Sequence, residues 1–230
     1  MGSSRTSSIG KTNESALRFL SVNTYGSVMG IAGLSLAWRS SHHLFGTSSV
    51  ISAWIGLMAI VIFAFLSICY MIKWINFPQV VHAELSHPIA GNFFGAITVG
   101  ILLISSIILP YSQLLGQTVW IVGTILTILL CYVLVSRLFR VKQDQLHAVP
   151  AMLIPVVAIL NVPVTGVTMP FGWAHEWNLF CFAIGSIAAL IFLTMIVSRL
   201  IQQEPMSAVM NPSLLILIAP FEERSIYEGA

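Results

Sequence analysis

The sequence predicts an all-α polytopic membrane protein, and its composition, its long apolar runs and its shortage of charge together support this fold class. Of 230 residues, 57% are hydrophobic and 8% are charged, the net charge is +2, and the mean hydropathy is +0.92. A soluble domain carries about 25% charged residues, because its surface must be solvated. The composition therefore excludes a soluble enzyme, a disordered chain and a nucleic-acid-binding protein, which would need clustered basic charge.

Apolar runs divide the chain into candidate membrane spans. A helix needs about 20 apolar residues to cross the hydrocarbon core, and the helix satisfies its backbone groups internally. We therefore expect about seven transmembrane helices, of which the last is short. The runs are 19–38, 50–72, 89–109, 114–136, 148–170, 177–198 and 207–221.

The flanks and loops predict the boundaries and the orientation. Residues 1–17 are rich in serine and predict a disordered cytosolic tail, residues 18–221 form the transmembrane domain, and residues 222–230 form a charged tail. With the N-terminus inside, eight of the ten Lys and Arg residues fall on the cytoplasmic side, as the positive-inside rule requires. Arg39 falls in an outer loop. No organelle signal is apparent, so we expect a multi-pass protein of the cell (inner) membrane.

Proline and glycine alternate between the runs. The second, fourth and sixth runs contain no proline, whereas the odd runs are repeatedly interrupted. A proline kinks a helix, and freed backbone groups are tolerated in a membrane only against protein or a water-filled cavity. We therefore expect hairpin repeats of a kinked inner helix and a straight outer helix, with a pathway between the inner helices. The candidate pore-shaping residues are Gly26, Gly30, Gly91, Gly95, Pro155, Pro163 and Pro220.

Asparagine follows the same division. Asn23, Asn92 and Asn161 fall in the first, third and fifth runs, so they are candidate polar contacts in the pore. The runs contain no Asp, Glu, Lys, Arg or His, which argues against a voltage sensor or a buried proton relay. Helix N-termini would suit an anion and free carbonyls a cation, and the basic loops would favour anions by long-range attraction.

The loop between the second and third runs is the densest polar feature. It contains Phe77, Pro78, Glu84, His87 and Pro88. Glu84 and His87 would share one face of a helical turn, which permits a weak metal-site interpretation. We prefer the interpretation that Glu84 and Ser86 cap and order the start of the third helix.

Four stretches resemble a known family. They are the opening helix from Tyr25 to Leu34 with Ala37-Trp38-Arg39, the loop pattern Phe77-Pro78, Ala83-Glu84 and His87-Pro88, the segment 153–158 leading to Asn161, and Pro212-Ser213-Leu214 with Ile218-Ala219-Pro220. Their order and spacing are similar to those of the tellurite-resistance/dicarboxylate transporter family of TehA-like proteins, which includes the plant slow anion channels. None of these stretches is a catalytic signature.

The resemblance implies ten helices in five hairpins around a central pore, with the odd helices inside. It also implies transport of small anions or C4-dicarboxylates, tellurite resistance in bacterial relatives, a homotrimeric assembly in the lipid membrane, no cofactor, no bound metal and no enzyme activity. The family pattern continues for three more helices, so we expect a C-terminally truncated member. The family's gating phenylalanine in the ninth helix then has no counterpart.

Two alternatives stay open. One is a non-conducting fragment, indicated by the charged residues after Phe221. The other is a membrane-embedded metal-dependent hydrolase that would use His82, Glu84 and His87, although such a site needs three ligands and an activated water.

Overall fold

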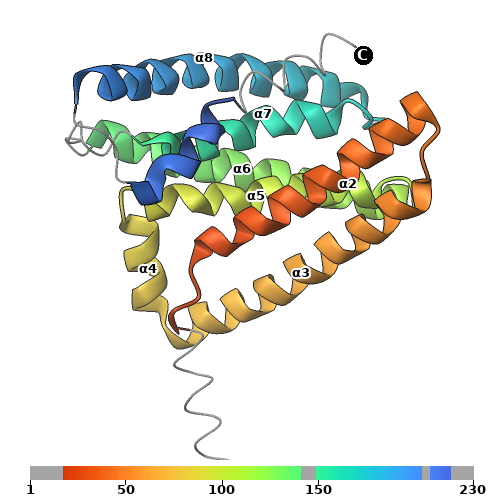
Figure 1. Ribbon diagram of the computed structural model, residues 1–230, viewed down its shortest axis with the longest axis horizontal. Coiled ribbons are helices and arrows are strands. Elements are labelled where there is room, and N and C mark those ends of the chain that lie inside the picture. The colour runs from red at the N-terminus through yellow and green to blue at the C-terminus, as the bar shows by residue number, and fades with distance from the viewer. Residues whose placement is uncertain (1–17, 141–148, 204–207, 219–230) are drawn as a thin grey trace, which may run out of the picture.

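The computed structural model describes residues 18–140, 149–203 and 208–218, and every regular element among them is helical. The first hairpin pairs α2 (Tyr25–Phe45) with α3 (Ser49–Asn76), and α4 (Pro78–Ser86) follows it. The second pairs α5 (Phe94–Ile108) with α6 (Gln113–Arg140), and the third pairs α7 (Ile154–Gly166) with α8 (Gly172–Gln202). Figure 1 shows the three hairpins side by side. The predicted all-α fold class is confirmed.

The inner and outer helices differ in how they begin. Each inner helix follows a 3₁₀ turn: η1 (Val22–Thr24) precedes α2, η2 (Ala90–Phe93) precedes α5, and η4 (Pro150–Leu153) precedes α7. The outer helices α3, α6 and α8 have 28, 28 and 31 residues and no preceding 3₁₀ turn. The repeating unit is therefore a 3₁₀ turn, a shorter inner helix and a long outer helix.

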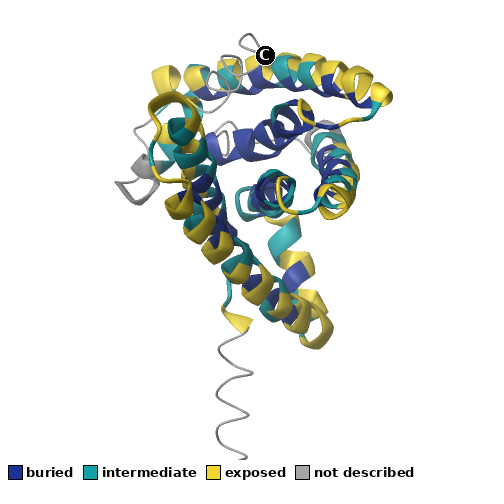
Figure 2. Ribbon diagram, turned by 90° about the vertical axis from the view of Figure 1, so that its right-hand side faces the viewer, coloured by how far each residue is buried: buried dark blue, intermediate teal, exposed yellow. Residues whose placement is uncertain are grey.

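Burial divides the helices in the same way. In α7, 12 of 13 residues are buried, whereas α3 buries 6 of 28 and α8 buries 7 of 31. Figure 2 shows the outer helices turning their exposed residues away from the bundle. The exposed side chains of α3 include Trp54, Phe65 and Ile68, which suits a helix that faces lipid. Among the described residues, four segments are long and apolar enough to cross a membrane, namely 49–76, 90–108, 113–136 and 172–202.

Close contacts hold the hairpins together. Ser35 and Ser52 each donate a hydroxyl hydrogen bond to the other's carbonyl oxygen at 2.9 Å, which joins α2 to α3. At the end of α7, a Cβ on Gly166 would lie 2.7 Å from the Trp120 ring and would also clash with the Asn178 side chain. A side chain there would force the helices apart, so Gly166 permits α7 to approach α6 and α8 closely.

The seventh run differs from the expected spanning helix. Its described part forms the 3₁₀ helix η5 (Ala208–Ile218), which has 11 residues. Pro212 lies in this segment and has no N–H to donate, which disfavours a regular α-helix. Pro220 lies outside the described residues, as do the two predicted tails, 1–17 and 222–230.

Candidate functional site

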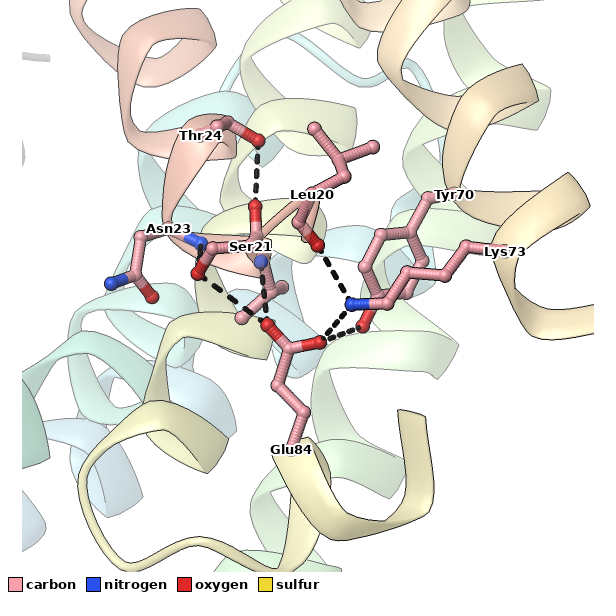
Figure 3. A network of polar contacts seen from close by, with 8 residues as sticks. Leu20, Ser21, Asn23, Thr24, Tyr70, Lys73 and Glu84 are labelled. Atoms are coloured by element: carbon pink, nitrogen blue, oxygen red, sulfur yellow. Dashed lines mark hydrogen bonds and ion pairs between the residues drawn. The ribbon is translucent and has the colours of Figure 1, made fainter. Parts of the chain in front are cut away.

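A polar network joins the beginning of the first inner helix to the end of the first outer helix (Figure 3). The Glu84 carboxylate accepts hydrogen bonds from the Val22 backbone N–H at 2.8 Å, from Tyr70 Oη at 3.1 Å and from Lys73 Nζ at 2.6 Å. Lys73 Nζ also donates to the Leu20 carbonyl at 2.7 Å. The Lys73 side chain is 2% exposed. Its charge is neutralised in the interior by the Glu84 carboxylate.

The Phe77-Pro78 pair explains how Glu84 reaches this position. Pro78 lacks an N–H and begins α4 at its first turn, where proline is favoured. The Phe77 carbonyl accepts from the N–H groups of Val80 and Val81 at 3.0 and 3.3 Å. The chain therefore turns directly from α3 into α4 and carries Glu84 back toward the start of α2.

These contacts correct the predicted roles in this loop. Glu84 caps the 3₁₀ turn η1 that precedes the first inner helix, since it accepts from the N–H of Val22, and Ser86 contacts His82 Nδ1 at 3.4 Å. The third run is capped instead by His87, whose Nδ1 accepts from the N–H groups of Ile89 and Ala90 at 3.2 and 3.1 Å. The sequence places Glu84 near the third run, but only the fold shows that the start of the first run is closer.

Burial raises the pKa of the Glu84 carboxyl, but the hydrogen bonds from Lys73, from the Val22 N–H and from Tyr70 outweigh burial and hold the pKa below its ordinary value of 4.5. Glu84 is therefore ionised at neutral pH. Because the carboxylate is engaged by Lys73 and Val22, it is not presented to His82 and His87. The described residues contain no group of three or more His, Cys, Asp or Glu side chains placed to hold a metal ion.

A second feature is a cavity of about 680 Å³ between the three inner helices. Its lining residues come from α2, α5 and α7 and from the short segments that follow α5 and α7, and none comes from α3, α6 or α8. Apolar side chains such as Leu36, Leu103 and Val164 form much of the wall. The polar lining includes Ser40, Asn161, Thr165 and Thr168, together with Arg39.

One predicted polar contact lies in this cavity. Asn161 lines it from α7, is buried, and donates its Nδ2 to the Val157 carbonyl at 3.1 Å. Asn23 and Asn92 instead lie in the 3₁₀ turns η1 and η2, away from the cavity wall. Asn92 donates to the Pro88 carbonyl at 2.9 Å, so its amide orders the turn that precedes α5.

The predicted pore-shaping residues separate into two groups. Apart from the adjoining residues and backbone of α2 itself, no atom of the described residues lies within 4 Å of a Cβ placed on Gly26 or Gly30, so α2 presents a bare surface there. Gly95 instead packs against α7, where its Cβ would lie 3.1 Å from the backbone nitrogen of Pro155. Gly91 is buried in η2, Pro155 lies in the first turn of α7, and Pro163 lies inside α7.

Arg39 is the residue that sequence reasoning missed. The sequence predicts an outer loop for Arg39, but α2 continues to Phe45, and the half-buried Arg39 lines the cavity. Its Nη1 donates to the Ser106 carbonyl at 2.9 Å. The helical spacing could have indicated this position, because Arg39 follows the apolar Leu36 by three residues and so shares its face.

The fold and the cavity define a class: a multi-pass helical membrane protein in which inner helices enclose a partly polar cavity with a cationic side chain at one end. The sequence model of the family described as voltage-dependent anion channel (SLAC1) matches residues 20–222. The chain belongs to this family, and the resemblance expected from the sequence motifs is confirmed.

Individual relatives agree with this assignment. An uncharacterized transporter of Methanocaldococcus jannaschii is 28% identical over 168 residues, which cover 69% of this chain and 49% of the relative. The tellurite resistance protein TehA homolog of Haemophilus influenzae is 26% identical over 179 residues, covering 76% and 53%. The S-type anion channel SLAH2 of Arabidopsis thaliana is 24% identical over 218 residues, covering 91% and 41%. The chain spans about half the length of the curated relatives it matches.

Proposed function

We propose that this protein moves small anions or dicarboxylates across the cell membrane along a pathway between α2, α5 and α7. The observation that carries the proposal is the cavity of about 680 Å³ lined by these three helices and the segments that follow α5 and α7, with Arg39 in its wall. A membrane-embedded cavity with a cationic wall lowers the energy of an anion relative to a cation. Family membership supports anion transport in general.

The proposed path runs along the axis of the inner helices. Asn161 supplies a polar contact in the middle of α7, and the bare surface at Gly26 and Gly30 leaves room beside α2. With the N-terminus cytoplasmic, as the distribution of Lys and Arg favours, the Glu84 network lies at the inner end and Arg39 at the outer end. We also propose a homo-oligomer, with three subunits as the family resemblance implies, and with lipid against the outer helices.

A non-conducting fragment is the second candidate. The observation that favours it is the α2 surface, because no other helix of the described residues comes within 4 Å of a Cβ on Gly26, Gly30 or Gly33. On this view another segment or subunit would have to complete the wall beside α2 before anions pass.

The test is anion flux into vesicles that contain the purified full chain. Phenylalanine at Ala37, in the cavity wall, should obstruct the pathway and lower nitrate or chloride flux by about tenfold or more, since added volume in a confined space is not absorbed without displacement. The matched control is Ala64→Phe on the exposed side of α3, which should keep the wild-type rate. Flux no faster than in protein-free vesicles would overturn the proposal in favour of the non-conducting fragment, and equal flux in both variants would overturn the pathway.

A further inference from the structure

Arg39 occupies a place in the fold that its neighbours create. The helix α5 ends at Ile108, and Pro110 follows two residues later. The Ser106 carbonyl would normally accept from the N–H four residues on, which is position 110, and proline has no N–H. Arg39 supplies the missing donor at 2.9 Å, and the negative end of the α5 dipole favours a cation at this point.

The contacts at the end of α2 keep Arg39 in position. The helix ends at Phe45, and the next residue, Gly46, has a left-handed φ of 68° and donates its N–H to the His42 carbonyl at 2.9 Å. Trp38 Nε1 donates to the Ser48 carbonyl at 3.2 Å, and His42 Nδ1 contacts the Thr47 carbonyl. Trp38 and His42, which lie on either side of Arg39 in the sequence, therefore both bind the turn that leads into α3.

The charge of Arg39 has no carboxylate partner in the part of the chain that the structure describes. The two carboxylates there are Glu84 and Glu176, and the one ion pair among these residues joins Glu84 to Lys73. A guanidinium carries five N–H donors, and the bond to Ser106 uses one of them. Arg39 therefore holds a positive charge, with donors to spare, at the edge of the cavity.

Other polar groups in the wall are engaged locally. The Ser40 hydroxyl donates to the Leu36 carbonyl at 3.2 Å, the Thr165 hydroxyl to the Asn161 carbonyl at 2.8 Å, and the Asn161 amide to the Val157 carbonyl. Arg39 thus supplies the formal charge of the described wall, and the remainder is largely apolar. One cation balances one negative charge, whereas a dianion would bring a second charge into this surrounding without a partner.

We propose that Arg39 is an anion-binding residue at the end of the cavity formed by the last turns of α2 and α5 and the end of α7, and that the site holds one small monovalent anion. This inference rests on the proposed function for its physiological meaning, but the binding itself is measurable without transport. Thr168 follows α7 and lines the same cavity, so it offers a way to change the local charge while Arg39 remains in place.

The experiment is ³⁵Cl line broadening by the full chain in a neutral detergent at constant ionic strength, with nitrate as competitor. We expect broadening by the wild-type protein that nitrate removes. Arg39→Gln should weaken chloride binding by about 10- to 100-fold, the usual range for a hydrogen bond to a charged group, while Gln can still donate to Ser106. Arg39→Lys should keep most of the binding because it keeps the charge. The matched charge control is Arg18→Gln, which alters an exposed arginine before η1 and should change nothing.

A second pair of variants leaves Arg39 in place. Thr168→Glu places a carboxylate in the same cavity and should weaken chloride binding about as much as Arg39→Gln, whereas the uncharged Thr168→Gln should not. Sulfate should compete less effectively than nitrate. Broadening that is absent in the wild type, or that survives both Arg39→Gln and Thr168→Glu, would overturn the site, and sulfate competing as well as nitrate would overturn its monovalent character.

The vesicle assay separates this inference from the proposed function. Chloride binding that depends on Arg39 in a protein without flux would support the site and overturn transport. Flux that is blocked by Ala37→Phe but unchanged, in rate and in anion preference, by Arg39→Gln would support the pathway and overturn the role of Arg39 in it.

Discussion

Lys73 and Arg39 are two basic side chains in the interior of the same bundle. Lys73 comes from α3 and lies beside the beginning of α2, whereas Arg39 lies in α2 toward its other end. Lys73 is 2% exposed and lies 2.6 Å from a carboxylate oxygen of Glu84, with the Leu20 carbonyl and the Tyr70 ring close by. Arg39 is half-buried, and its guanidinium donates to the neutral Ser106 carbonyl beside a cavity.

The difference separates two uses of a cation. At Lys73 a negative charge neutralises the ammonium, and the hydrogen bonds connect α2, α3 and α4. At Arg39 the carbonyl fixes the guanidinium without cancelling its charge, so the field extends into the cavity. The first arrangement stabilises the fold, and the second is suited to attract a ligand.

The largest expected effect is on stability at the Lys73 end. Glu84→Ala leaves the buried Lys73 ammonium without its carboxylate, which should lower the free energy of unfolding by about 3–5 kcal/mol. Arg39→Met should cost about 1–3 kcal/mol, since it leaves one carbonyl without a donor. Denaturant unfolding of both variants in detergent micelles would measure this.

The control for that comparison is the double variant Lys73→Met/Glu84→Ala, which removes both charges and should recover part of the loss. Equal destabilisation by Glu84→Ala and Arg39→Met would contradict the distinction between the two cations.

A smaller effect should appear as a function of pH. Because the pKa of folded Glu84 lies below the ordinary value of 4.5, its contribution to stability is fully present above that value and is lost as the pH falls through the folded pKa. The melting temperature should therefore show a Glu84-dependent decrease only in acid, below about pH 4.5. Comparison with Glu84→Gln, which cannot titrate, isolates the part of the pH dependence that is due to Glu84. A Glu84-dependent loss already at pH 6 would show that the carboxylate is not stabilised as described.

The smallest expected effect concerns Tyr70. Tyr70→Phe removes the hydroxyl that lies 3.1 Å from Glu84 but keeps the ring contacts with Tyr25 and Phe94. The loss should be about 1.5 kcal/mol, the lower end of the range for a hydrogen bond to a charged group. The control is Tyr25→Phe, whose hydroxyl lies 3.5 Å from Ser67 and should contribute less. If thermal unfolding shows the same loss for both, then the Tyr70 hydroxyl does not take part in the network.

The fold class was predictable because membrane insertion depends on local composition. A long apolar run without charge is a helix whatever its neighbours are, and the clustering of proline and glycine in the odd runs predicted a repeat of inner and outer helices. The short 3₁₀ form of Ala208–Ile218 was missed, since apolar composition alone does not report how a segment coils.

The site was predictable only in part. Asn161 was identified because it lies in an interrupted helix, and it does line the cavity. Asn23 and Asn92 share its composition signal but occupy 3₁₀ turns. Arg39 was assigned to a loop because charge marked the end of the apolar run. Its contact with Ser106 spans 67 residues, and no local pattern reports a partner at that distance.

The contact between Val22 and Glu84 has a consequence for biosynthesis. The two residues are 62 positions apart, and a ribosome adds about 5–20 residues per second. Roughly 3–12 s therefore pass between the synthesis of Val22, at the start of η1, and the synthesis of the carboxylate that binds its N–H. During that interval the start of α2 has neither Glu84 nor, at first, Lys73. The start of the first hairpin is thus completed only after α3 and most of α4 have been made, and this fixes an order for the assembly of these helices.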